Sequence, residues 1–169
     1  MSSERQVYVT VYFNVGARLS GMSLKQKIVY LRDRRRFMVW VLSVLTRFLT
    51  RGEYAHVAVS VDGKTLDPRW TGDRVVRTIA YLKSCPSLAY LVPVARHAEI
   101  EWLARPHRKP IVPSLVRFFL GGRSSAPNCV TRVASVLRLC GVPAHDGIVT
   151  PRQLAEFLEA QGGVRVDLA

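Results

Sequence analysis

The sequence predicts an α+β protein in which an antiparallel sheet of about four to six strands packs against a cysteine-bearing helix. Short runs of β-branched and aromatic residues are separated by turn residues, and two of these runs are joined by Asp62-Gly63, a dipeptide typical of tight hairpins. Elsewhere apolar residues recur every three or four positions, which is the period of an amphipathic helix. We expect one domain over residues 1–169, because this length leaves no room for a second large core.

Residues 6–50 are expected to form a strand and then a long basic helix, both placed before the strand that carries His56. From Gln6 to Val15 the β-branched and aromatic residues nearly alternate with others, as in a strand. From Ser23 to Leu49 the apolar residues are spaced three or four apart, with one gap at Arg35. This spacing predicts one long helix, or two helices in line.

The arginines of this helix are expected to meet an anionic partner. The chain has 25 Lys and Arg against 12 Asp and Glu, a net charge of +13, which implies an anionic partner such as a nucleic acid or a membrane surface. Arg32, Arg34, Arg35 and Arg36 form the densest basic run, and we interpret it as an anion-binding patch. An ordinary solvated helix face is the alternative interpretation.

The middle of the chain is expected to supply the other strands. Residues 54–61 and 64–67 flank the Asp62-Gly63 turn and predict an antiparallel hairpin. Residues 75–79 and 88–94 are two further predicted strands of the same meander. Short helices are expected at residues 99–104 and 114–120, on either side of a proline-broken basic connector.

Two helices are expected near the C-terminal end. Asn128 is a suitable cap for a helix over residues 129–139, which Gly141 would end. Thr150 and Pro151 are typical of the start of a helix and predict one over residues 152–160.

The cysteines and the apolar stretches indicate the compartment. Cys85, Cys129 and Cys140 lack the spacing of a zinc site and are too few for a disulfide framework, so we expect a reducing compartment, no metal and no cofactor. No export signal is visible, and the longest apolar stretch, Phe37 to Leu49, is well short of the ~20 residues that span a bilayer. We expect a protein that is cytoplasmic as synthesised.

Cys129 is the residue most suited to chemistry, because it would lie in the first turn of a helix. The positive end of the helix dipole favours a thiolate there, and free backbone N–H groups can hold an oxyanion. A tight turn at Asp62-Gly63 would bring His56 and Asp67 together at the open end of two paired strands. Such an arrangement predicts a cysteine nucleophile with a histidine oriented by a carboxylate.

Two segments carry a resemblance to a known group of enzymes. Residues 50–63 read Thr-Arg-Gly-Glu-Tyr-Ala-His-Val-Ala-Val-Ser-Val-Asp-Gly, and residues 128–141 read Asn-Cys-Val-Thr-Arg-Val-Ala-Ser-Val-Leu-Arg-Leu-Cys-Gly. Together with Thr150-Pro151 they resemble the circularly permuted papain-like families, namely the permuted NlpC/P60 group of phage and prophage type and the lecithin retinol acyltransferase-like enzymes. Ordinary NlpC/P60 enzymes have the cysteine helix before the histidine strand, and here the order is reversed.

The resemblance implies a circularly permuted papain-like fold and a cysteine hydrolase, a peptidase or amidase of cell-wall peptides. It also implies an anionic cell-wall polymer or other virion proteins as partners, and association with a virion as a second location. It implies Cys129 as the nucleophile, His56 as general base and acid, and Asp67 as the third polar residue. The acyltransferase-like relatives carry a histidine at the third position, so here either the residue type or the strand register differs. Tyr54 and Asn128 are expected to shape an oxyanion pocket.

Two other functions remain open from the sequence. A papain-like shell without catalysis could serve as a virion component or as a basic module that binds nucleic acid. A lipid acyltransferase, held on anionic membranes by the arginine-rich helix, is the third reading. A thiol of low pKa that contacts an imidazole would favour the hydrolase over the non-catalytic shell.

Overall fold

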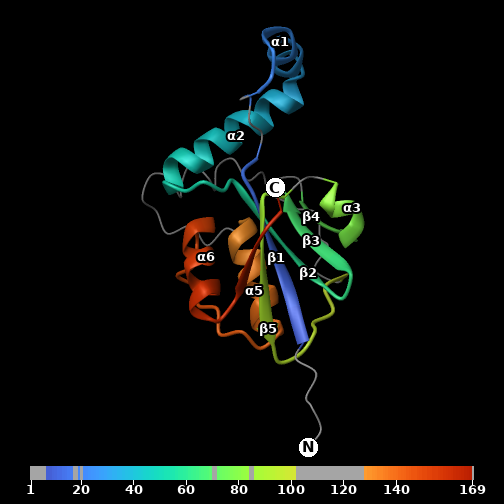
Figure 1. The fold of residues 1–169 in the computed structure, drawn as a ribbon, viewed down its shortest axis with the longest axis vertical. Coiled ribbons are helices and arrows are strands. Elements are labelled where there is room, and N and C mark those ends of the chain that lie inside the picture. Colours follow the sequence, from blue (N-terminus) through green and yellow to red (C-terminus); the bar gives the residue numbers. More distant parts are fainter. Residues whose placement is uncertain are drawn as a thin grey trace, which may run out of the picture.

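The computed structural model describes residues 7–16, 19, 21–69, 72–83, 86–101 and 128–168. Within these residues the protein is an α+β protein with an open six-stranded antiparallel sheet and five helices (Figure 1). The predicted class and number of strands are confirmed. The strands are β1 Val7–Asn14, β2 His56–Val61, β3 Lys64–Arg69, β4 Gly72–Arg77, β5 Leu88–Val94 and β6 Val164–Asp167. The helices are α1 Leu24–Arg32, α2 Arg34–Thr50, α3 Thr78–Leu82, α5 Cys129–Leu139 and α6 Pro151–Ala160.

The strand order across the sheet is β4-β3-β2-β1-β5-β6, and all neighbouring strands are antiparallel. Only β2, β3 and β4 follow one another as a simple meander. The first strand, β1, lies between β2 and β5, so the predicted meander is interrupted at its centre. Its central place suits a strand made mostly of β-branched and aromatic residues, because both of its edges are paired and one of its faces is buried in the main core.

The two faces of the sheet have different partners. Alternate side chains of β1, such as Val11 and Phe13, belong to the main core with α5 and α6. Tyr12 points to the other face and joins a smaller cluster with Tyr81 of α3. Figure 1 shows α5 and α6 beside each other along the sheet. The helix that carries Cys129 is therefore fixed by core packing on the main face.

The N-terminal helical region is divided, as one of the two predicted alternatives allowed. The break is at Asp33, whose Oδ1 accepts a hydrogen bond from the backbone N–H of Arg36 at 3.2 Å. A side-chain oxygen in this position caps the start of a new helix, so α2 begins at Arg34. None of the helices described combines the length and the apolar character needed to span a bilayer.

Two details differ from the prediction. The predicted strand 75–79 ends at Arg77, because the chain turns into α3 at Thr78. The short strand β6 was not predicted, and it pairs with β5 to form one edge of the sheet.

The predicted helices 129–139 and 152–160 are confirmed, and the second starts one residue earlier, at Pro151. The predicted helix 114–120 and most of the predicted helix 99–104 lie outside the described residues.

Candidate active site

The β2–β3 hairpin brings the first two candidate residues together. Asp62 and Gly63 have φ angles of 47° and 72°, the left-handed pair that a two-residue hairpin turn requires. Val59 then pairs with Leu66, which places His56 near the end of β3 that carries Asp67 and Arg69. Residues two apart on a strand share a face, so the side chains of Asp67 and Arg69 point to the same side.

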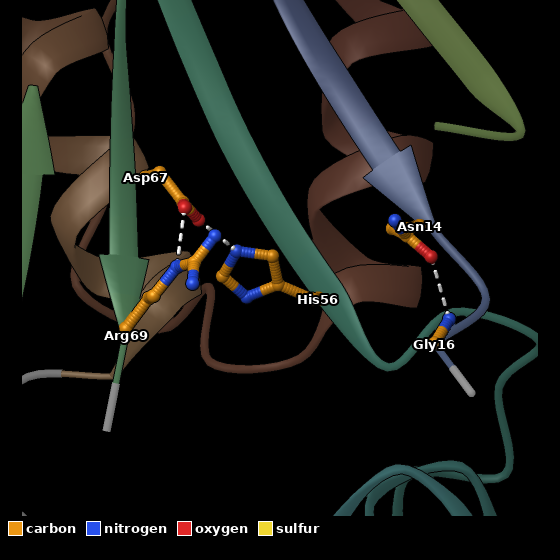
Figure 2. Close-up of polar contacts among 5 residues, drawn as sticks. All are labelled: Asn14, Gly16, His56, Asp67 and Arg69. Carbon is orange, nitrogen blue, oxygen red and sulfur yellow. Dashed lines mark hydrogen bonds and ion pairs between the residues drawn. The ribbon is translucent and has the colours of Figure 1, made fainter. Parts of the chain in front are cut away.

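Asp67 lies between His56 and Arg69 and bonds to both (Figure 2). The His56 Nε2 is 2.7 Å from Oδ1 of Asp67, and the Arg69 Nε donates to Oδ2 at 2.6 Å. The Asp67 side chain is only 3% exposed, so an ionised carboxylate there needs both partners. Because an ionised carboxylate only accepts, Nε2 carries the proton and Nδ1 is left for another contact.

The Cys129 thiol also interacts with the His56 side chain, and each of the two groups shifts the pKa of the other. Cys129 is the first residue of α5, as predicted, and is half-buried. Asn128 caps the helix: its Oδ1 accepts from the backbone N–H of Thr131 at 2.8 Å, and the Thr131 Oγ1 accepts from the Asn128 N–H at 2.9 Å. The structure thus brings together Cys129, His56 and Asp67, the three residues predicted to act together.

The electrostatics of the thiol and the imidazole favour an ion pair. Burial by itself would raise the pKa of the Cys129 thiol, but the hydrogen bond and charge of His56 lower it, as do hydrogen bonds from the backbone N–H groups of Val57 and Val130. Burial would lower the pKa of His56, yet the hydrogen bonds to Asp67 and Cys129 and their charges raise it to about 9. Because the thiol pKa is lowered and the imidazole pKa is raised, the thiolate–imidazolium form of the pair is favoured over the neutral form.

Asp67 and Arg69 stabilise the charged form of this pair. Burial would raise the pKa of Asp67, but the hydrogen bonds and positive charges of His56 and Arg69 lower it below the ordinary value. The carboxylate is therefore ionised at neutral pH and balances the imidazolium. Arg69 was not among the predicted site residues. Arg69 lies two residues beyond the predicted strand 64–67, so it would have shared a face with Asp67 only if that strand continued.

Tyr54 and Asn128 were predicted to shape an oxyanion pocket, and the contacts seen for their side chains are of another kind. The Tyr54 ring packs edge-on against Phe13, with ring centroids 5.1 Å apart. Burial raises the pKa of Tyr54, and the charge of Arg165 on β6 opposes that rise. The Asn128 amide is used for capping, since its Nδ2 donates to the Val149 carbonyl at 3.2 Å. The backbone N–H groups of Val57 and Val130 are the donors that the structure places at the sulfur.

The predicted anion-binding arginines lie away from these residues, at the junction of α1 and α2. Arg32, Arg34 and Arg36 are exposed, and the side chain of Arg35 lies outside the described residues. Arg36 pairs with Asp33 at 3.4 Å and stands over the Tyr30 ring at 5.7 Å from its centroid. Part of this positive charge is thus already balanced within the helices.

Among the described residues no group of three or more His, Cys, Asp or Glu side chains could hold a metal ion. Neither the comparison with protein-family models nor the searches against curated proteins and solved structures gives a match.

Proposed function

We propose that the protein is a cysteine hydrolase that works through an acyl-enzyme, with Cys129 as nucleophile, His56 as general base and acid, and Asp67 orienting the imidazole. The observation that carries the proposal is that the His56 side chain is hydrogen-bonded through Nε2 to the buried Asp67 at 2.7 Å and also interacts with the Cys129 thiol. A thiolate at a helix N-terminus, next to an imidazolium, is the activated form of a cysteine nucleophile.

The reaction follows from these positions. The Cys129 sulfur forms a bond to the carbonyl carbon of an amide, and the His56 imidazolium gives its proton to the leaving amine as the C–N bond breaks. His56, now neutral, takes a proton from water, whose oxygen attacks the acyl carbon and releases the carboxylic acid and the thiolate. Backbone N–H groups near the sulfur supply hydrogen bonds for the negative oxygen formed in each step.

A circularly permuted papain-like fold of the NlpC/P60 type is part of the same proposal. Its support is the chain order, in which the strand with His56 precedes the helix with Cys129, and the packing of α5 on the sheet. The resemblance of residues 50–63 and 128–141 to the permuted NlpC/P60 group favours the amide bonds of cell-wall peptides as substrate.

Selective alkylation tests the nucleophile. Iodoacetamide at mildly acidic pH should modify Cys129 well before Cys140, which is buried and whose thiol pKa is raised by that burial. His56→Ala should remove the preference without unfolding the protein, which circular dichroism can check. Equal rates for the two thiols in the parent protein would contradict the proposal.

Hydrolysis of cell-wall peptide fragments tests the substrate. The parent protein should release a new amine, and Cys129→Ala should release none. Alkylation that is selective for Cys129, together with no hydrolysis of these fragments, would retain the nucleophile and reject this substrate class. A parent protein with neither property would be the non-catalytic shell.

A further inference from the structure

The arm formed by α1 and α2, residues 24–50, takes no part in the proposed reaction. Figure 1 shows it at one end of the sheet, with α1 projecting away from the body and the C-terminal end of α2 lying above α6. No residue of α1 is buried. Within the part of the chain that the structure describes, α1 is the element with which α2 packs extensively. An arm of this kind contributes little to the core, so core packing does not explain the residues on its surface.

The side of α2 that meets the body is small and polar. Ser43 is buried, and it approaches Gly16 so closely that a Cβ on that glycine would lie 2.5 Å from the serine Oγ. Thr46 and Thr50 follow Ser43 at the spacing that keeps residues on one side of a helix, and both are half-buried. The helix therefore turns its polar side toward the body, the reverse of the usual arrangement in a globular protein.

The apolar side of α2 faces solvent. Phe37, Val44 and Phe48 recur at helical spacing, and Phe48 is 78% exposed. Between them runs an open apolar groove lined by Trp40, Val41, Val44, Leu45 and Phe48. On α1 the apolar residues Leu24, Ile28 and Val29 are also more than half exposed. Apolar exposure that continues over two helices is typical of a surface with a partner.

Basic residues accompany this apolar surface. Arg32 and Arg34 are exposed where the two helices meet, and Arg34 precedes Phe37 by one helical turn. Lys25 is exposed on α1. Asp33 is the one acidic residue in the sequence of the arm, and it is paired with Arg36. The arm thus combines exposed aromatic and aliphatic side chains with net positive charge.

We propose that this arm docks on an anionic lipid surface, with the apolar side of α2 among the acyl chains and Arg32 and Arg34 at the headgroup phosphates. A nucleic acid would use the arginines but would gain nothing from an exposed row of Phe, Val and Leu, whereas a lipid interface uses both. The 17 residues of α2 suit a helix that lies in the interface. The proposal does not depend on the hydrolase activity.

Docking would also determine where the candidate active site lies relative to the lipid surface. His56 follows the end of α2 by six residues, and it pairs with Asn14 at the end of β1 from which the arm departs. The Asn14 Oδ1 accepts a hydrogen bond from the Gly16 N–H at 2.7 Å, which fixes the chain where it enters the arm (Figure 2). The same end of the sheet would therefore face the lipid surface.

Vesicle flotation tests the proposal with phosphatidylcholine vesicles that either contain or lack phosphatidylglycerol. The full-length protein should float with the anionic vesicles and be released by salt. Phe37→Ser with Phe48→Ser, and separately Arg32→Glu with Arg34→Glu, should each lower partition into anionic vesicles by about tenfold or more. Trp40 fluorescence should shift to the blue on binding, and a Trp40→Phe variant should lose that shift but still float.

Matched variants outside the arm serve as controls. Ile79→Ser removes an equally exposed apolar side chain on α3, and Arg74→Glu with Arg77→Glu makes the same change in net charge on β4. Both should float like the parent, and all variants should keep the selective alkylation of Cys129. Arm variants that float as the parent does would overturn the proposal. Two results with the parent protein would also overturn it. One is binding to duplex DNA without binding to vesicles, and the other is a dimer formed through the arm, seen by sedimentation velocity, without binding to vesicles.

Discussion

The protonation state of His56 governs both half-reactions of the proposed mechanism. Its Nε2 is held by Asp67 at 2.7 Å, and Asp67 is held in turn by Arg69 at 2.6 Å. Arg69 is thus a positioning residue that acts through the carboxylate. The Asp67 carboxylate and the Cys129 thiol both interact with the imidazole, and together they raise its pKa to about 9.

The pH dependence of kcat/KM should therefore extend into the alkaline range. The acid limb should lie below the ordinary range of a cysteine, because the pKa of Cys129 is lowered. The alkaline limb should lie at about 9, where the His56 imidazolium loses the proton that an amine leaving group needs. Rates measured from acidic to alkaline pH on an amide substrate check both limbs.

A nitrophenyl ester provides the control for this profile. Its leaving group departs without a proton, so the alkaline limb should disappear while the acid limb remains. Asp67→Asn should move the alkaline limb of the amide reaction to lower pH, because the carboxylate is one of the groups that raise the pKa of His56. An alkaline limb that is the same for both substrates would show that His56 is not the proton donor.

Helix α5 positions the sulfur through its N-terminal cap. Replacing Asn128 by Ala removes the bond to the Thr131 N–H and the bond to the Val149 carbonyl. We expect the free energy of unfolding to fall by about 1 kcal/mol and the alkylation of Cys129 to slow. Denaturant unfolding and alkylation rates measure the two effects.

A second cap of the same type gives a matched control. Thr150 caps α6 with the same reciprocal arrangement, its Oγ1 accepting from the Gln153 N–H at 3.2 Å. Thr150→Ala should cost a similar free energy and leave the alkylation rate of Cys129 unchanged. If both variants slow alkylation equally, general loosening of the fold explains the effect better than the position of α5.

Local signals account for the elements that the sequence predicts well. The Asp62-Gly63 turn depends on two adjacent residues, and the caps at Asn128 and Thr150 depend on residues three apart, so the hairpin and both helices were predictable. The pairing of Asp67 with His56 followed from that hairpin. The sequence could not show the N–H of Val57 at the sulfur, because that contact depends on how α5 packs on the sheet.

The edge strand of the sheet and the orientation of α2 were less predictable from the sequence, because both depend on contacts between distant residues. The edge strand β6 has four residues, three of them exposed, so it lacks the apolar run of an interior strand and exists through its pairing with β5. In α2 the apolar period was recognised, but a period does not say which side meets the body. Only the contact between Ser43 and Gly16 shows that the polar side does.

The molecule as a whole places a partly buried charged cluster at one end of the sheet, beside the apolar core. Val57 and Val59 of β2 are fully buried in the main core, and the next residue toward the end of the sheet is His56, whose side chain is 27% exposed. The cluster of His56, Asp67 and Arg69 thus joins the core to the surface. Its ionic contacts contribute to the stability of the entire domain as well as to the site.

Acid should weaken the fold through Asp67. The pKa of this carboxyl is lowered in the folded protein, so its contribution is present above the ordinary value of 3.8 and is lost as pH falls through the lower folded value. His56 adds no slope there, because below its ordinary value of 6.5 it is protonated whether folded or unfolded. At neutral pH, Asp67→Asn should lower the free energy of unfolding by roughly 1–3 kcal/mol, and this difference from the parent should disappear in strong acid.

Urea unfolding at several pH values measures this difference. Asp62→Asn, which changes an exposed carboxylate in the hairpin turn, is the control and should follow the parent. A gap between parent and Asp67→Asn that stays constant into strong acid would mean that packing at residue 67, and not its charge, stabilises the fold.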